Sequence, residues 1–159
     1  MAKTVELTTR IAAPPEVVLR HVMTPRLLDH VAAPMIRFSY PPSFDRAGEW
    51  PLGKHCVTMR FMGIIPIGWQ VIGIEVPDSP DKDTHLLRDN GYGPLIRRWD
   101  HWIAVRPDPS GSGTLYTDRV HIDAGLLTPV IAAYAKVFYA HRQKRWRELA
   151  ADGFAALRG

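Results

Sequence analysis

The stretch RRWDHWIAV, residues 97–105, places a histidine between two tryptophans and beside an aspartate. An imidazole titrates near neutral pH, so His101 could move a proton, hold a ligand or fill the core. The alternation around it is typical of a β-strand, in which every second side chain lies on the same face. The role of His101 therefore depends on its face and on the group opposite it.

A second segment, residues 113–122, supplies that group if the two segments form a hairpin around PDPSGSG. With Val105 opposite Thr114, His101 lies opposite Asp118 on a mostly apolar face. A buried carboxylate beside an imidazole stabilises the charged ring and fixes its orientation. We predict an inward-facing His101–Asp118 pair, which could be structural, anchor a ligand or act as a general acid/base.

The rest of the chain supplies the elements that must position this pair. Residues 4–11 alternate like a strand, two short helices begin at Pro14–Pro15 and at Thr24–Pro25, and the second stops at Pro34. Six further strands are predicted at residues 36–40, 55–62, 68–76, 84–89, 96–105 and 113–122, with connections too short for parallel crossovers. A long helix follows Gly125. The sequence predicts an α+β fold with a seven-stranded, curved antiparallel sheet wrapped around this C-terminal helix.

Within the sheet, the predicted middle hairpin puts Phe61 opposite Trp69. That register turns Gly73 toward the apolar face, where its missing side chain leaves space, and turns Gln70 toward the other face. On the long helix, apolar spacing predicts an inward stripe of Leu127, Ile131, Tyr134, Phe138, His141, Arg145 and Leu149.

A single helix is about 10 Å across with its side chains, so it cannot fill the space under a wide sheet. The remainder becomes either large core side chains or a cavity with apolar walls and a few polar groups. The candidate ligand-binding residues are Phe61, Trp69, Tyr92, Trp99, His101, Tyr116, Asp118, Tyr134, Phe138 and His141.

Composition limits the other function classes. A chain of 159 residues fits one domain, residues 1–159, and one cysteine together with an N-terminus lacking a signal-like apolar run predicts a cytoplasmic protein. No metal-binding spacing or nucleotide loop occurs, so we expect neither a metal nor a cofactor. No segment is apolar enough to insert in a membrane. The net charge of +4 and the run HRQKRWR, residues 141–147, fit a solvated helix face, and no nucleic-acid motif accompanies them.

Three stretches resemble the START-like (SRPBCC) superfamily, in particular its polyketide cyclase/dehydrase-like members. They are IAAPPEVVLRHVMTPRLL, GPLIRRWDHWIAV and GTLYTDRVHIDAG, and the resemblance covers essentially the whole chain. It implies a helix-grip fold. Such members often carry W-x-H-x-H-x-F on the penultimate strand; here Trp99 and His101 match, whereas Ile103 and Val105 replace the second histidine and the phenylalanine. That replacement argues against a two-histidine site.

These observations predict a protein that binds a small, largely apolar molecule, aromatic or polyketide- or lipid-like, between the sheet and the long helix. The alternative is a cyclase- or dehydratase-type enzyme in which Asp118 orients His101 as general acid/base. A third hypothesis is an interaction module whose basic helix binds anionic lipid or nucleic acid. The sequence leaves the oligomeric state open, a homodimer included.

Overall fold

The chain forms its elements in the predicted order, and the computed structural model describes all of residues 1–159. Strand β1 (Lys3–Ile11) precedes two short helices, α1 (Pro15–Val22) and α2 (Pro25–Ala32). Six strands follow: β2 (Ile36–Ser39), β3 (Gly53–Phe61), β4 (Ile65–Glu75), β5 (His85–Gly91), β6 (Arg98–Pro107) and β7 (Thr114–Asp123). The 3₁₀ turn η1 (Gly125–Leu127) leads into the long helix α3 (Thr128–Ala151), and a second one, η2 (Ala155–Leu157), follows it.

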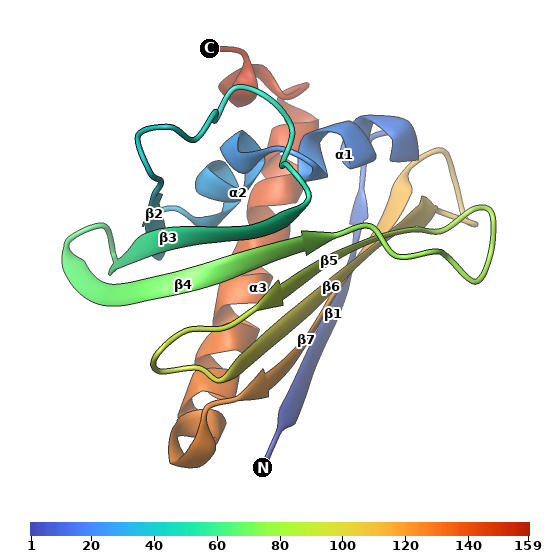
Figure 1. Cartoon of the computed structure of the whole chain (residues 1–159). Helices are drawn as coiled ribbons and strands as arrows, with labels where there is room; N and C mark the ends of the chain where they lie inside the picture. Colours follow the sequence, from blue (N-terminus) through green and yellow to red (C-terminus); the bar gives the residue numbers. More distant parts are fainter.

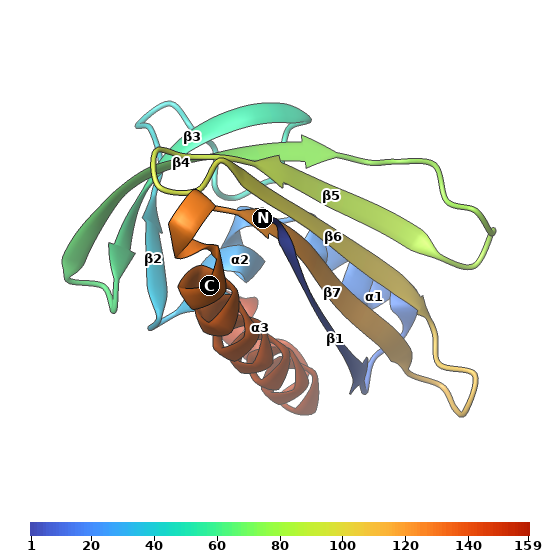
Figure 2. The ribbon, with the colours of Figure 1, turned by 90° about the horizontal axis from the view of Figure 1, so that it is seen from below.

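The seven strands form one antiparallel sheet in the order β1-β7-β6-β5-β4-β3-β2. Its two edges curve toward α3, so that the strands arch over the helix when seen along its axis (Figure 2). Helices α1 and α2 close one end of the arch, near the C-terminal half of α3 (Figure 1). This is the predicted helix-grip arrangement, in which one curved sheet wraps around one long helix. None of the helices is both long and apolar enough to cross a membrane.

Local sequence signals explain where the helices begin. Thr24 has an extended backbone, and its hydroxyl accepts a hydrogen bond from the Leu27 amide at 3.2 Å, as expected of an N-cap. Proline occupies the first turn of α1, α2 and α3, where its missing N–H removes no helical hydrogen bond.

The β6–β7 hairpin differs from the predicted register by two residues. Val105 pairs with Tyr116 and His101 with Val120, because the strands continue to Pro107 and Thr114 before a tighter turn. Inside this turn the Asp108 carboxylate accepts the Ser110 amide at 2.9 Å. A slip of two residues keeps every side chain on its face, so His101 still points inward.

The β3–β4 hairpin departs further from the predicted register, because its inward and outward faces are exchanged on β4. Its turn contains Met62 and Gly63, both with positive φ, and a bulge follows where Met59 pairs with Gly68. The result is that Gln70, not Gly73, shares the inner face with Val57. A side chain at Gly73 would meet the Asn90 carbonyl oxygen at 2.6 Å, so this glycine permits close approach of β4 and β5 rather than adding space to the cavity.

Helix α3 turns a broader face inward than the predicted stripe, and three residues of that stripe, Ile131, Tyr134 and Phe138, line the cavity. Phe138 and Leu149 are buried as predicted, whereas Leu127 is 49% exposed. The other buried side chains are Thr128, Ala132, Ala135, Tyr139, Arg142, Gln143, Trp146. His141 and Arg145 instead bind the backbone carbonyls of Ala33 and His30, so that side of the helix packs against α2. Two packed faces on one helix blur the single apolar stripe that the prediction assumed.

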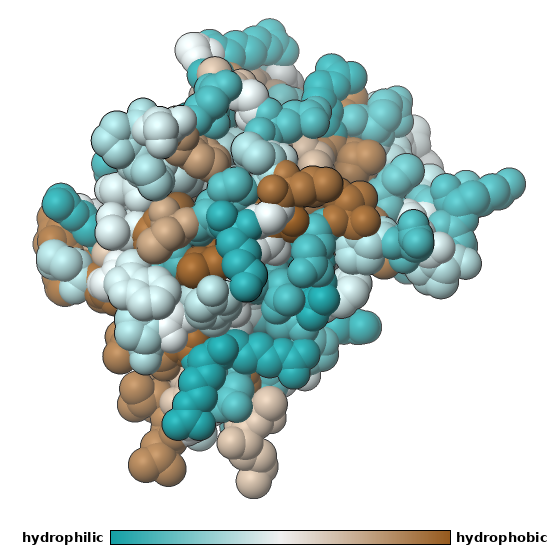
Figure 3. Space-filling view, in the orientation of Figure 1, coloured by the Kyte–Doolittle hydropathy of each residue, from teal (hydrophilic) through white to brown (hydrophobic).

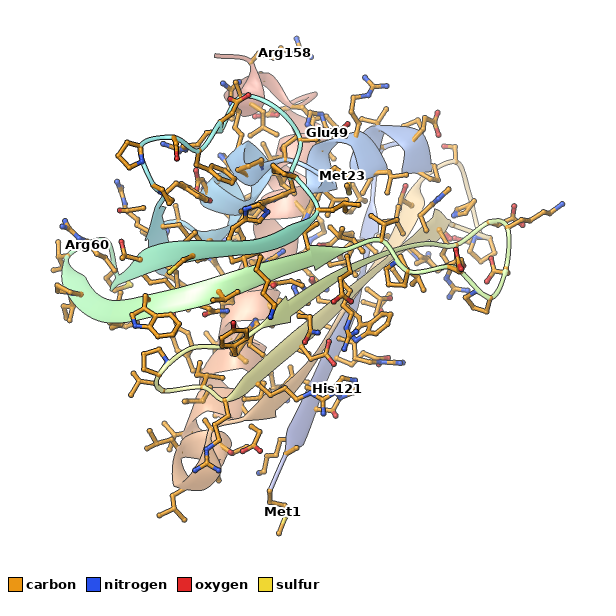
Figure 4. All side chains as sticks on the ribbon, in the orientation of Figure 1. Met1, Met23, Glu49, Arg60, His121 and Arg158 are labelled. Carbon is orange, nitrogen blue, oxygen red and sulfur yellow. The ribbon has the colours of Figure 1, made fainter.

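The outer face of the sheet carries its own polar contacts. Asp100 on β6 binds Arg88 at 2.8 Å and Arg98 at 2.8 Å. Further along the sheet, His121 on β7 binds the Thr4 hydroxyl on β1, and Figure 4 shows this histidine on the side facing away from α3. These contacts give the sheet a charged outer face, opposite the mostly apolar inner face that the sequence predicts for His101.

Candidate functional site: a cavity between the sheet and helix α3

A cavity of about 360 Å³ lies between the concave face of the sheet and α3. Fifteen of its 21 lining residues are hydrophobic, which makes its walls apolar. The lining residues come from α2, β2, β3, β4, β5, β6, α3 and the loop before β6; representative hydrophobic ones are Leu28, Phe38, Met59, Ile72, Trp99 and Phe138. The volume lies within the range of small-molecule sites, roughly 300–1,000 Å³.

One end of the cavity is bordered by residues that are also exposed at the surface. Leu95 in the β5–β6 loop, Val130 at the start of α3 and Trp69 on β4 all line the cavity and are 57%, 70% and 43% exposed. Figure 3 shows hydrophobic residues gathered over the beginning of α3, where Leu126 and Leu127 are also exposed. We take this end as the entrance.

The opposite end of the cavity is polar. A second hollow of about 50 Å³ adjoins it, and both hollows are lined by Leu28, Ile72, Asp89, His101 and Arg142. Three of these five shared residues carry titratable side chains. The deep end therefore joins an apolar chamber to a small group of buried polar side chains.

His101 and Asp118 form the centre of this group. The His101 Nε2 lies 2.8 Å from the Asp118 Oδ1, and the two residues are 3% and 0% exposed. They do not lie directly opposite each other, because Asp118 pairs with Ile103; the contact runs diagonally across β6 and β7. Diagonal neighbours on one face of a sheet are within reach of a ring as long as imidazole.

Two other residues complete the hydrogen bonding of Asp118. The Tyr116 hydroxyl donates to Oδ1 at 3.2 Å, and the Gln143 amide donates to Oδ2 at 3.0 Å. Gln143 also donates to the Leu7 carbonyl at 2.8 Å, which ties α3 to β1. Asp118 is therefore held from two strands and one helix, as a fully buried carboxylate requires.

The pKa shifts of His101 and Asp118 show which of the two residues is protonated at neutral pH. Burial lowers the pKa of His101, against the opposing influence of the Asp118 carboxylate. Burial alone would raise the pKa of Asp118, but the hydrogen bond from His101 and the charge of Arg142 hold it below its ordinary value. Asp118 is thus ionised and His101 neutral at pH 7. The ring must then carry its proton on Nε2 to donate to Asp118, which leaves Nδ1 as the basic nitrogen.

Asp89 extends the polar end of the cavity along the sheet. It pairs with His101 across β5 and β6, and its Oδ1 accepts the Gly73 amide at 2.8 Å. Burial raises the pKa of Asp89 to about 7, although that hydrogen bond and the charge of Arg142 act in the opposite direction. Near neutral pH, this carboxyl group therefore exists in both protonation states.

Arg142 of α3 faces the same end. It is 5% exposed, and its guanidinium carbon lies 5.2 Å from the ring centre of Tyr139 and 5.8 Å from that of Phe138. Its Nη2 is 4.0 Å from the Asp118 Oδ1, beyond hydrogen-bond distance. The Arg142 Nε and the hydroxyl groups of Tyr134 and Tyr139 are buried without hydrogen-bond partners.

The structure brings half of the predicted ligand-binding residues to the cavity wall. Those that line it are Trp69, Trp99, His101, Tyr134 and Phe138. Asp118 and Tyr116 lie one layer behind His101, and Tyr116 packs against Trp146 at 5.2 Å between ring centres.

The other three predicted residues lie away from the wall. Phe61 stands beside it, 6.0 Å from the ring of Tyr134, and His141 binds the Ala33 carbonyl. Tyr92 is placed elsewhere: it bridges to Val71, and Lys54 lies over its ring, on the outer side of the sheet. Val71 faces outward in the observed β3–β4 register, and its bridge partner Tyr92 shares that face.

Sequence reasoning missed Gln70, Asp89, Tyr139 and Arg142 on the cavity wall. Asp89 could have been found by extending the strand pairing to β5, since it lies opposite His101. Arg142 carried no such signal, because an arginine within HRQKRWR fits an exposed helix face equally well. No group of three or more His, Cys, Asp or Glu side chains is arranged to hold a metal ion.

Comparisons with known proteins agree with the fold. A family model described as "Domain of unknown function (DUF8410)" matches residues 9–150. The structure of Ara h 8.0201 is similar with a TM-score of 0.61 at 10% identity, covering 96% of this chain and 99% of that one. Protein Ms6760 from Mycobacterium smegmatis gives 0.59 at 16% identity, covering 92% and 89%. Protein CV1439 from Chromobacterium violaceum gives 0.63 at 13% identity, covering 92% and 96%.

No curated protein matches the sequence. At these identities, the likeness to solved structures concerns the fold, and it bears out the helix-grip fold that the START-like resemblance implied.

Proposed function

The chain belongs to the DUF8410 family, and from its cavity we propose that it binds a small, largely apolar molecule between the sheet and α3. The molecule enters between the β5–β6 loop and the start of α3 and lies along Trp99, Phe138 and Tyr134. Aromatic side chains of this kind favour an aromatic or polyketide-like ligand.

The observation that carries this proposal is the 360 Å³ of unfilled space behind mostly hydrophobic walls. Protein interiors are packed as densely as organic crystals, and empty apolar volume destabilises a fold. A cavity of this size, with an apolar rim and a polar deep end, has the composition of a ligand site rather than of a packing defect. The START-like resemblance supports the same class of function, since that superfamily includes lipid carriers and hormone receptors.

The test narrows the cavity without touching its polar end. Ile131 lines the cavity, whereas Val137 lies on the same helix, is 61% exposed and does not line it. Ile131→Trp should weaken binding of the apolar dye Nile red by about tenfold or more, because the indole occupies the ligand's space. Val137→Trp is the matched control and should bind as the wild type does. Equal dye affinity in both variants would refute the proposal.

Native mass spectrometry of gently purified protein provides an independent measurement. A small molecule retained by the wild type should be lost from Ile131→Trp and kept by Val137→Trp. Its mass also restricts which compounds need to be tested in later assays.

A second candidate function is favoured by the state of His101. The neutral ring borders the cavity and is oriented through Nε2 by Asp118, which leaves Nδ1 basic. This is the arrangement of a general base fixed by a carboxylate, as a cyclase or dehydratase would use. His101→Ala should then abolish turnover of the retained compound while leaving its affinity within a few-fold. An equal loss of affinity and turnover would instead make His101 a binding anchor.

A further inference from the structure

We propose that the ligand carries an anionic planar group such as a carboxylate, and that Arg142 binds this group at the deep end of the cavity. The proposal rests on the proposed binding function and adds the polarity and orientation of the ligand. The charged group lies against α3 and β5, and the apolar part extends toward Leu95 and Val130 at the entrance.

The Arg142 guanidinium is buried, and its Nε lacks a hydrogen-bond partner. The residue is 95% buried, since only 5% of its surface is exposed, and it lines both hollows. Its Nε has no hydrogen-bond partner, and the Asp118 Oδ1 lies 4.0 Å away. A buried cation is stable only when it is paired and hydrogen-bonded, and a guanidinium pairs best with a planar oxyanion at about 2.7–2.9 Å.

The carboxylate of Asp118 is already committed to other donors. Asp118 accepts hydrogen bonds from His101 and Tyr116 on Oδ1 and from Gln143 on Oδ2. Those three contacts hold it on the sheet side, away from close contact with Arg142. The positive charge of Arg142 is therefore balanced at a distance but not directly bonded.

The neighbouring groups are mostly donors. The hydroxyl group of Tyr139 has no hydrogen-bond partner, and this residue lines the cavity beside Arg142. Asp89 adds an O–H donor in its protonated form, which its raised pKa keeps populated near pH 7. Phenol, guanidinium and carboxylic acid donors that converge on one end of a cavity fit an acceptor-rich group on the ligand.

An ionised Asp89 would favour the opposite charge, so the experiment compares both. Three probes share one ring and differ in charge: 2-naphthoate, 2-naphthalenemethanol and 2-naphthylmethylamine. Their affinities are measured at pH 7 by isothermal titration calorimetry and by quenching of tryptophan fluorescence, since Trp99 lines the cavity. The naphthoate should bind about tenfold more tightly than the alcohol, and the amine most weakly.

Variants at Arg142 test whether this residue causes the preference for naphthoate. Arg142→Gln should reduce naphthoate affinity by about tenfold and alter affinity for the alcohol by less than about threefold. Arg142→Lys keeps the charge and should retain the preference for the acid, and it remains informative if the glutamine variant does not fold. Lys144→Gln removes the same charge from an exposed position of α3, 67% exposed, and should leave all three affinities unchanged.

The outcomes separate the two proposals. Binding of none of the three probes contradicts the binding function itself. Similar binding of the acid and the alcohol leaves the cavity as an apolar site and overturns the assignment of Arg142. Tightest binding of the amine overturns it in favour of Asp89 as the anchor. A preference for naphthoate that survives in Arg142→Gln but is lost in Lys144→Gln would mean that surface charge, not the cavity, attracts the anion.

Discussion

Replacing Asp118 with asparagine should lower the free energy of unfolding by about 2–4 kcal/mol, because a neutral amide replaces a buried, charged acceptor of three hydrogen bonds. The side chain is fully buried and accepts hydrogen bonds from His101, Tyr116 and Gln143. Each bond to a charged group contributes about 1.5–3 kcal/mol. Asparagine keeps one acceptor oxygen but turns an NH₂ donor toward other donors, so roughly half of this contribution is lost.

The measurement is urea unfolding at pH 7, followed by tryptophan fluorescence. Glu148→Gln is the control, because Glu148 is 54% exposed and lies 3.8 Å from Lys144; it should alter stability by less than about 0.5 kcal/mol. Combining Asp118→Asn with Arg142→Met removes both charges, and the double variant should be more stable than additivity predicts by about 1–3 kcal/mol. A loss below about 1 kcal/mol for Asp118→Asn, or strict additivity, would show that these residues do not form a coupled buried cluster.

Three further predictions concern stability. The folded-state pKa of Asp89, about 7, lies above its unfolded value near 3.8, so its contribution to stability is present at low pH and is lost as pH rises through 7. Asp89→Asn should therefore melt higher than the wild type at pH 8 and equally at pH 4; a constant difference across that range would contradict the raised pKa. Arg88 and Arg98 hold the pKa of Asp100 at about 2 despite its burial, so its contribution is present above pH 4 and is lost as pH falls toward 2. Asp100→Asn should lose about 1–2 kcal/mol at pH 6 in urea unfolding, after allowance for solvent screening, and the difference should close near pH 2; a difference that persists there would argue against a charge effect. Thr24→Ala removes the N-cap of α2 and should cost about 1 kcal/mol by the same method, so a change below about 0.3 kcal/mol would deny the cap its role.

The sequence was sufficient for the element order because each element carries a local signal. Alternation marks β6 and β7, proline marks the first turns of the helices, and glycine- and aspartate-rich turns separate the strands. The short connections excluded a parallel sheet. The inward position of His101 was also predictable, because the error of two residues in the β6–β7 register preserved its face.

Register within the middle hairpin depended on details that alternation does not encode. One bulge beside Gly68 shifted β4 by a single residue and reversed its faces, which brought Gln70 inward and turned Val71 toward Tyr92. Bulges arise from backbone conformation at single positions, here a glycine with positive φ. The identity of the cavity residues on β4 therefore could not follow from hydrophobic pattern alone.

The charged residues of α3 were missed for a different reason. Sequence periodicity treats arginine and glutamine as solvent-facing, yet Arg142 and Gln143 are both buried against the sheet. Gln143 has Asp118 and the Leu7 carbonyl as hydrogen-bond partners, and these lie 25 and 136 residues away in the sequence. Burial of a polar side chain is decided by such distant partners, so only the assembled fold reveals it.

Arg142 and Gln143, adjacent on α3, have different roles at the deep end of the cavity. Gln143 donates a hydrogen bond to the Asp118 Oδ2 and another to the Leu7 carbonyl, which connects α3 to β1. Because its amide is neutral, these contacts add no charge to the site. Arg142 is thereby not required as the clamp between helix and sheet, and its guanidinium stays 4.0 Å from Asp118 while bordering the cavity. If Arg142 served only to neutralise Asp118, its guanidinium would be expected within hydrogen-bond distance of that carboxylate rather than 4.0 Å away. A fold that supplies a separate clamp and still buries the arginine beside the cavity keeps a cation available for a ligand, which is why the deep end, rather than the apolar walls, should determine which molecules bind.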